Sequence, residues 1–238
     1  MRVALFVPCF VDAIYPAVAE SAVRVLERLG HEVVFPCDQT CCGQPPFNAG
    51  DWEASREVAR HQVRALAGHE VVVALSGSCG AMLKVFYREL FAGDRDEALA
   101  LEVAGATREF ADFLTNVLGV EDVGARFEAR ATYHDGCHGL RELGLKEAPR
   151  RLLWRVRGLE LLEMEDGETC CGFGGLFSVK FPMISAAMGE VKCEAILATG
   201  ADVVISGDSS CLMHIGGMLA RQGRRKRCLH FAEVLAME

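Results

Sequence analysis

The chain has 238 residues, of which 51% are hydrophobic, so it is long enough to bury one large core or two modest ones. Its formal net charge of −8 argues against nucleic-acid binding, which needs a dense basic face. Eleven cysteines exceed what a chain of this size needs as disulfides, and they favour metal or redox chemistry in a reducing compartment.

The first expected element is a buried strand over Val3–Val7, a short run rich in apolar residues. A secretory signal is the alternative, because Ala17-Val18-Ala19 is similar to a cleavage site. Asp12 and Pro16 interrupt that segment, however, so a strand is favoured. No apolar run reaches the ~18 residues needed to span a bilayer. We therefore expect a cytoplasmic protein with no transmembrane segment.

Strands and helices then alternate through the first half of the chain. A helix is expected over Ala17–Leu29 with Gly30 as its stop, followed by a buried strand over Glu32–Phe35. A helix over Trp52–Leu66 and a buried strand over Val71–Leu75 complete this half. Such alternation predicts a parallel sheet with right-handed crossovers.

Residues 93–128 are rich in Ala, Glu and Leu, and we expect helices there that bridge two lobes. Beyond them, strands are expected over Ala131–His134, Glu160–Leu162 and Val203–Ser206, and helices over Pro149–Val156 and Pro182–Leu197. The basic run Arg224–Arg227 is interpreted as a solvated helix end. The predicted domains are a first lobe at 1–92, bridging helices at 93–128 and a second lobe at 129–238.

The cysteines reveal an internal repeat of about half the chain. Cys9, Cys41-Cys42-Gly43 and Cys79 match Cys137, Cys170-Cys171-Gly172 and Cys211 at offsets of 128, 129 and 132 residues. The text around Cys79 (VVVALSGSC) also matches that around Cys211 (VVISGDSSC). We therefore predict an α/β fold of two similar lobes related by pseudo-twofold symmetry, each a small parallel sheet flanked by helices.

Each half thus supplies four cysteines to the sheet edge where open parallel sheets bind their ligands. Four thiolates have the right number and softness for an iron–sulfur cluster or for zinc. The adjacent cysteines could bridge irons, bind alternative sites or leave one thiolate free; strained disulfides and simple core residues are the other interpretations. Gly43 and Gly172 would let the backbone approach sulfur and direct N–H groups at it.

Other residues near the cysteines are weaker candidates for a functional role. His134, Asp135 and His138 flank Cys137, and His214 follows Cys211. A histidine so close to a thiolate could be a ligand or proton partner, but is more typical of an ordinary polar residue near a loop. Asp208 could cap the following helix and Lys180 could offset cluster charge, although both could equally be solvated surface groups. The three remaining cysteines are interpreted as structural thiols: Cys37, Cys193 and Cys228.

Several longer segments carry a resemblance to a known family. The resemblance lies in four segments: Cys170-Cys-Gly-Phe-Gly-Gly, Phe177-Ser-Val-Lys, Ile184-Ser-Ala-Ala-Met and Ser206–Ile215. In them the chain resembles the cysteine-rich CCG-domain iron–sulfur proteins, most closely their lactate utilization A branch. The cysteine-rich component of heterodisulfide reductase and the iron–sulfur subunit of glycolate oxidase belong to the same family. In the former each half ends in CxxC, whereas Met82 and His214 replace the last cysteine here. This departure argues against that relative's fused clusters and disulfide chemistry.

The resemblance implies an iron–sulfur electron-transfer subunit of an L-lactate-oxidising system. Its implied partners are a ferredoxin-like iron–sulfur subunit and a third subunit. The implied cofactor is one or two [4Fe-4S] clusters, with zinc possible in one half. The more strongly expected ligand site consists of Cys137, Cys170, Cys171 and Cys211, because the CCG loop of this half is richer in glycine. The second expected site consists of Cys9, Cys41, Cys42 and Cys79. His214 is an additional candidate ligand.

Two alternatives remain open at this stage. One is a thiol–disulfide reductase subunit, and the other is a zinc-stabilised scaffold subunit. No catalytic residue is assigned, and the sequence contains no nucleotide-binding or hydrolase motif.

Overall fold

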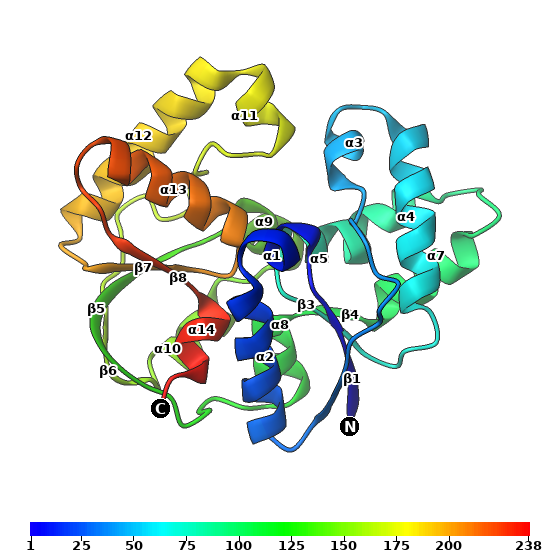
Figure 1. The fold of residues 1–238 in the computed structure, drawn as a ribbon, viewed down its shortest axis with the longest axis horizontal. Helices are drawn as coiled ribbons and strands as arrows, with labels where there is room; N and C mark the ends of the chain where they lie inside the picture. The colour runs from blue at the N-terminus through cyan, green and yellow to red at the C-terminus, as the bar shows by residue number, and fades with distance from the viewer.

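The computed structural model describes residues 1–238 and contains two four-stranded sheets, one from each half of the chain (Figure 1). The strand order is β2-β1-β3-β4 in the first sheet and β6-β5-β7-β8 in the second, and every strand pair is parallel. The two orders correspond strand for strand, so the predicted α/β fold of two similar lobes is confirmed.

The first sheet and its helices are formed by the N-terminal part of the chain. In chain order they are β1 (Arg2–Phe6), α1 (Cys9–Ile14), α2 (Pro16–Arg28), β2 (Glu32–Val34), α3 (Gln44–Asn48), α4 (Trp52–Leu66), β3 (Val72–Ala74), α5 (Gly77–Ala81), the π-helical turn η1 (Met82–Phe86), α6 (Tyr87–Leu90), α7 (Glu97–Ala106), β4 (Thr107–Glu109), α8 (Phe110–Asp112) and the π-helical turn η2 (Phe113–Val117).

The second sheet follows the same plan. Its elements are β5 (Arg126–His134), α9 (Cys137–Leu143), α10 (Glu147–Leu153), β6 (Arg157–Leu161), α11 (Leu176–Lys180), α12 (Pro182–Ala198), β7 (Val203–Ser206), α13 (Ser209–Arg221), β8 (Arg227–His230) and α14 (Phe231–Ala236). None of the helices combines the length and apolar character needed to cross a lipid bilayer.

The structure contains all six predicted strands and all four predicted helices, with three corrections. The segment 93–128 is not helical throughout, because it includes β4, which pairs with β3 in the first sheet. β2 is an edge strand with a partly exposed surface rather than a buried one. The basic run is not a helix end: α13 ends at Arg221, and Arg227 begins β8, a strand absent from the prediction.

One hydrophobic core connects the two halves. It includes Val3 and Val25 from the first half together with Val203 and Phe231 from the second. Helix α2 packs against α14, and the Arg28 guanidinium donates hydrogen bonds to the carbonyl oxygens of residues near the C-terminus. The short helices α1, α5 and α9 lie near the middle of the molecule in Figure 1, and α5 contacts α9 across the two halves. The ends of the central strands are therefore brought together.

Candidate metal centre

Four of the repeated cysteines occupy the first turns of helices that follow central strands. Cys9 and Cys137 are the first residues of α1 and α9, after β1 and β5. Cys79 and Cys211 lie in the first turns of α5 and α13, after β3 and β7. Since all these strands are parallel, their carboxyl ends deliver the four cysteines to corresponding edges of the two sheets.

The other four cysteines lie in two CCG turns with the same backbone conformation. Gly43 and Gly172 have φ angles of +85° and +88°. A Cβ atom at Gly172 would lie 2.6 Å from the Ser185 carbonyl oxygen, and one at Gly43 would lie 2.9 Å from that of Ser55. The Gly43 amide donates to Cys41 Sγ at 3.5 Å, and the Gly172 amide donates to Cys170 Sγ at 3.4 Å. Both the positive φ and the close backbone approach require glycine.

In each half the four thiol groups form a continuous row of neighbours. We call these the N-terminal row (Cys9, Cys41, Cys42, Cys79) and the C-terminal row (Cys137, Cys170, Cys171, Cys211), in the order in which the side chains contact one another. Cys42 Sγ, for example, lies 3.4 Å from Cys79 Sγ. All eleven cysteines are free thiols, so neither CCG pair is a disulfide.

One thiol in each row is strongly acidified. Hydrogen bonds from Cys42 and Cys9 lower the pKa of Cys41 to about 3, although burial opposes the shift. Hydrogen bonds from Cys137 and Cys171 lower the pKa of Cys170 to about 2 in the same way. The donors of these bonds have raised pKa values, because a hydrogen bond to the thiolate and burial both favour the protonated form: Cys9, Cys42, Cys137 and Cys171.

Hydrogen bonding within each row therefore favours the thiolate form of one cysteine, Cys41 or Cys170, and the protonated form of the two thiols that donate to it. Four thiolates at these separations would repel one another in a poorly solvated site. A bound metal ion or cluster supplies the positive charge that allows all four to ionise. Full ionisation of either row is therefore coupled to the binding of a cation.

Both rows face the same cavity, which has a volume of about 220 Å³. All eight cysteines of the two rows line it, together with apolar side chains such as Phe10, Phe173 and Leu176. The sequence predicted two separate sites from the repeat. The structure brings the two sets of thiols to the walls of one shared cavity.

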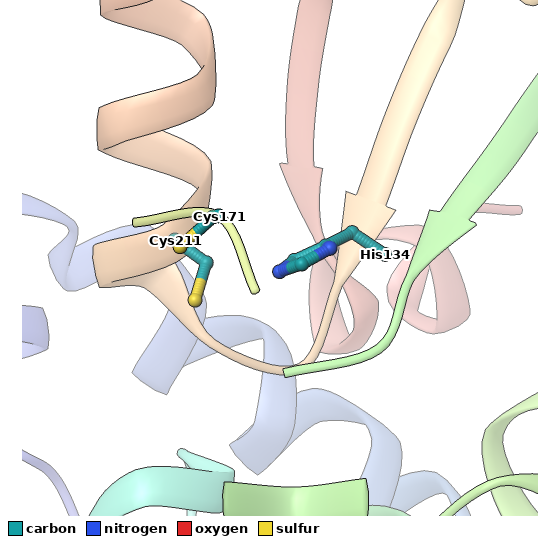
Figure 2. A group of neighbouring side chains, drawn as sticks. All are labelled: His134, Cys171 and Cys211. Carbon is teal, nitrogen blue, oxygen red and sulfur yellow. The ribbon is translucent and has the colours of Figure 1, made fainter. Parts of the chain in front are cut away.

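His134 joins the C-terminal row. Its imidazole is fully buried and extends from the end of β5 toward Cys171 and Cys211 (Figure 2). A ring nitrogen of His134 and the two sulfur atoms all lie within 4.8 Å of one another. Neither ring nitrogen has a hydrogen-bond partner, and burial lowers the pKa of this imidazole to about 4. The signal in the sequence was its position, three residues before Cys137 at the end of a strand.

The other two histidines lie differently. His138 Nδ1 is 3.7 Å from Cys137 Sγ, and its side chain lines the shared cavity. The His214 imidazole instead faces α12, since its Nε2 atom is 3.0 Å from the place where a Cβ of Gly189 would lie. It is outside the group formed by His134 and the two cysteines.

Charged side chains near the rows have structural partners. The Arg150 guanidinium donates two hydrogen bonds of 2.8 Å to the buried Asp135 carboxylate, which fixes the loop between β5 and α9. Asp208 caps α13, as the sequence suggested, by accepting from the Ser210 amide. Lys180 is exposed, whereas Lys192 is fully buried and its Nζ donates to the carbonyl oxygens of the loop that precedes Cys170.

Comparisons with known proteins agree with this arrangement. The profile of the CCG cysteine-rich domain matches residues 3–84 and 131–216, so each match contains one row. Proteins named lactate utilization protein A from Geobacillus sp. (strain WCH70) and Shouchella clausii are 47% and 50% identical to this chain over 236 residues. These matches cover 99% of this chain in both cases, and 99% and 98% of the two relatives.

A crystal structure of a hypothetical protein from Helicobacter pylori shares the fold. Its TM-score is 0.58 at 12% sequence identity, over 99% of this chain and 49% of that one. The two domain matches and the end-to-end similarity to curated relatives are far more specific than this likeness of fold. The chain therefore belongs to the cysteine-rich CCG-domain family, of which it carries two copies.

Proposed function

We propose that this chain is an iron–sulfur electron-transfer subunit of an L-lactate-oxidising system. The observation that carries the proposal is the pair of matching four-thiol rows on one cavity. The assignment to lactate comes from the shared name of the relatives that match the chain along its whole length. The proposed partners are a ferredoxin-like iron–sulfur subunit, which receives the electrons, and a third subunit of the same system.

The donor set fits an iron–sulfur cluster. Cysteine thiolates are the usual ligands of [4Fe-4S] clusters, which take four of them. Each row offers four thiols, one of them with a strongly lowered pKa, and none is consumed by a disulfide. We propose one or two [4Fe-4S] clusters held by the C-terminal row and the N-terminal row, with zinc in one row as the variant. When bound, such a cluster supplies one-electron oxidation and reduction.

The protein's own groups orient the ligands and modulate their charge. The amides of Gly43 and Gly172 donate to the Cys41 and Cys170 sulfur atoms and so stabilise negative charge there. The Tyr87 hydroxyl donates to the Cys42 carbonyl at 3.0 Å, which anchors the first CCG turn in the core. Apolar side chains line the cavity, and Cys42, Cys171 and Cys211 are buried, which limits access of water to their sulfur atoms.

The first test is metal analysis of protein purified without oxygen. We expect about four irons with matching sulfide for each filled row, and an electron paramagnetic resonance signal on reduction. Cys171→Ser should remove the cluster of the C-terminal row. Cys193→Ser is the matched control, because Cys193 is buried in the same half but belongs to neither row. Zinc without iron, or iron that cannot be reduced, would contradict the electron-transfer proposal.

Thiol–disulfide reduction is the second candidate, and the acidified thiols favour it. Cys41 and Cys170 line the cavity, and the hydrogen bonds that lower the pKa of each favour the thiolate, which is the form that attacks a disulfide. Rapid reduction of a disulfide by the prereduced protein, lost in Cys170→Ser, would support this candidate. Iron-loaded protein that transfers electrons but leaves disulfides intact would exclude it.

A further inference from the structure

The two halves differ at one structurally equivalent position beside the cysteine rows. Phe6 is the last residue of β1 and His134 is the last residue of β5, each three residues before the first cysteine of its row. Their register positions also correspond: Phe6 pairs with Ala74 on β3, and His134 pairs with Ser206 on β7. The same place in the repeat thus carries a benzyl group in one half and an imidazole in the other.

The environment of His134 does not satisfy an imidazole. The side chain is fully buried, as Phe6 is, and neither of its ring nitrogens has a hydrogen-bond partner. Buried polar groups in folded proteins are almost always paired, because an unpaired one loses its hydration without compensation. Phe6 shows that a purely apolar ring fits this place in the fold. His134 thus carries two buried ring nitrogens that no group of the protein chain pairs, whereas His214 and His230 each have one.

The nearest candidates for a partner of these nitrogens are atoms bound by the thiols. A ring nitrogen of His134 and the sulfur atoms of Cys171 and Cys211 lie within 4.8 Å of one another (Figure 2). The ring approaches this group from β5, while the sulfurs come from the CCG turn and from α13. An iron or zinc centre held by these thiols could take the imidazole nitrogen as a further ligand, since both metals accept nitrogen and thiolate donors.

We propose that His134 is a nitrogen ligand of a metal ion in the C-terminal row, so that the two halves hold chemically different centres. The proposal rests on the metal-binding function proposed above and deepens it. The N-terminal row is then an all-thiolate site with Phe6 as packing, and the C-terminal row is a mixed nitrogen–sulfur site. Because His134 adds a neutral nitrogen donor that the N-terminal row lacks, we expect the two centres to differ in reduction potential.

Isotope labelling tests the ligation directly. Wild-type protein is purified without oxygen, reduced, and studied by pulsed electron paramagnetic resonance with either natural-abundance or ¹⁵N-labelled histidine. We expect a nitrogen hyperfine coupling typical of a directly bound imidazole, which changes with the isotope. This readout needs no variant, so it does not depend on how a substitution affects folding.

Two variants assign the coupling to one histidine. His134→Phe copies the N-terminal half, and it should retain bound iron but lose the nitrogen coupling and shift the potential of one centre. His214→Phe is the matched control, since His214 lies in the same half but faces α12, and it should keep the coupling. Iron-loaded wild-type protein without the coupling, or a coupling lost in His214→Phe and kept in His134→Phe, overturns the inference alone. Wild-type protein that binds no iron overturns the proposed function and the inference together.

Discussion

Glycine at the CCG turns is a requirement of both conformation and space. At Gly172 a Cβ would overlap the Ser185 carbonyl oxygen at 2.6 Å, whereas at Gly30, which has a similar φ of +81°, nothing lies within 4 Å. A substitution at Gly30 therefore measures the free-energy cost of a left-handed backbone alone, whereas one at Gly172 also includes the cost of steric overlap.

We predict that Gly30→Ala lowers the free energy of unfolding by about 1 kcal/mol, from backbone conformation alone. Gly172→Ala should lower it by about 3 kcal/mol, because helix α12 must also move away from the turn. It should also reduce iron binding, since the amide that donates to Cys170 is displaced. Urea unfolding and metal analysis measure the two effects. Equal losses of stability in the two variants would show that the close approach is unimportant.

Lys192 stabilises the loop before Cys170, and the equivalent residue in the other half of the chain is neutral. Its Nζ donates to the carbonyl oxygens of Asp166 and Gly167, at 3.3 and 3.0 Å, in the loop that leads to Cys170. Gln62 lies at the matching place on α4 and accepts a hydrogen bond from the amide of Thr40, just before Cys41. Each buried side chain thus holds the approach to a CCG turn.

We predict that Lys192→Met lowers the free energy of unfolding of the metal-free protein by about 2 kcal/mol, because two partly buried hydrogen bonds from a charged donor are lost. Lys192→Gln should cost less, since its amide can still donate to one of the two carbonyl oxygens. Urea denaturation of both variants provides the comparison. If Lys192→Met were as stable as wild type, the amine would not be needed to hold this loop.

At the level of elements, the sequence predicted the central strands better than the edges. β3 and β7 are apolar runs buried on both sides, which periodicity detects. β4 is only three residues long and contains Arg108 and Glu109, so its composition is that of a loop or helix. Its strand geometry comes from pairing with β3, a long-range contact that no local pattern contains.

The last helix gives a pH-dependent prediction. α14 begins with a capping box in which His230 Nδ1 accepts from the Ala232 amide and Glu233 accepts from the His230 amide. Burial lowers the pKa of His230 to about 4. The folded protein therefore binds fewer protons here than the unfolded chain between pH 4 and 6.5, and stability rises with pH across that window.

We predict that His230→Asn reduces this rise by about 2 to 3 kcal/mol, because asparagine still caps the helix but does not titrate. Some slope should remain, since the pKa of His134 is lowered to about 4 by the same cause. The measurement is the free energy of unfolding in urea at several pH values between 4.5 and 7, on metal-free protein. An unchanged slope would mean that His230 is not neutral and buried in the folded state.

At the scale of the whole molecule, the repeat indicated which cysteines act together but not how the two sets meet. That the rows share one cavity depends on contacts between the halves, such as α2 against α14 and α5 against α9. The sequence named His134 as a possible ligand but favoured an ordinary polar role, because its unpaired nitrogens and its nearness to Cys171 and Cys211 exist only in the folded chain. Sequence patterns indicate local structure, whereas this site is formed by residues from both halves of the chain.

Two equivalent helix caps form the polar centre of that interface. Ser76 caps α5 and Asp208 caps α13, and these residues occupy matching places before Cys79 and Cys211. The Ser76 hydroxyl donates to Asp208 at 2.9 Å, and the Ser78 amide donates to the same carboxylate at 3.1 Å. Burial raises the pKa of Asp208, but hydrogen bonds from Ser210, Ser78 and Ser76 outweigh it and keep the pKa below its ordinary value.

We predict that Ser76→Ala and Asp208→Ala are coupled by about 1 to 2 kcal/mol in a double-mutant cycle, because the two residues share a buried charge-assisted hydrogen bond. Thr199→Ala with Asp208→Ala is the control pair; Thr199 bonds only to its own helix end and the turn that follows, so the losses should add. Urea unfolding should remain one transition, since a common core joins the halves. Additive losses for Ser76 and Asp208 would mean that apolar packing alone holds the two rows against their shared cavity.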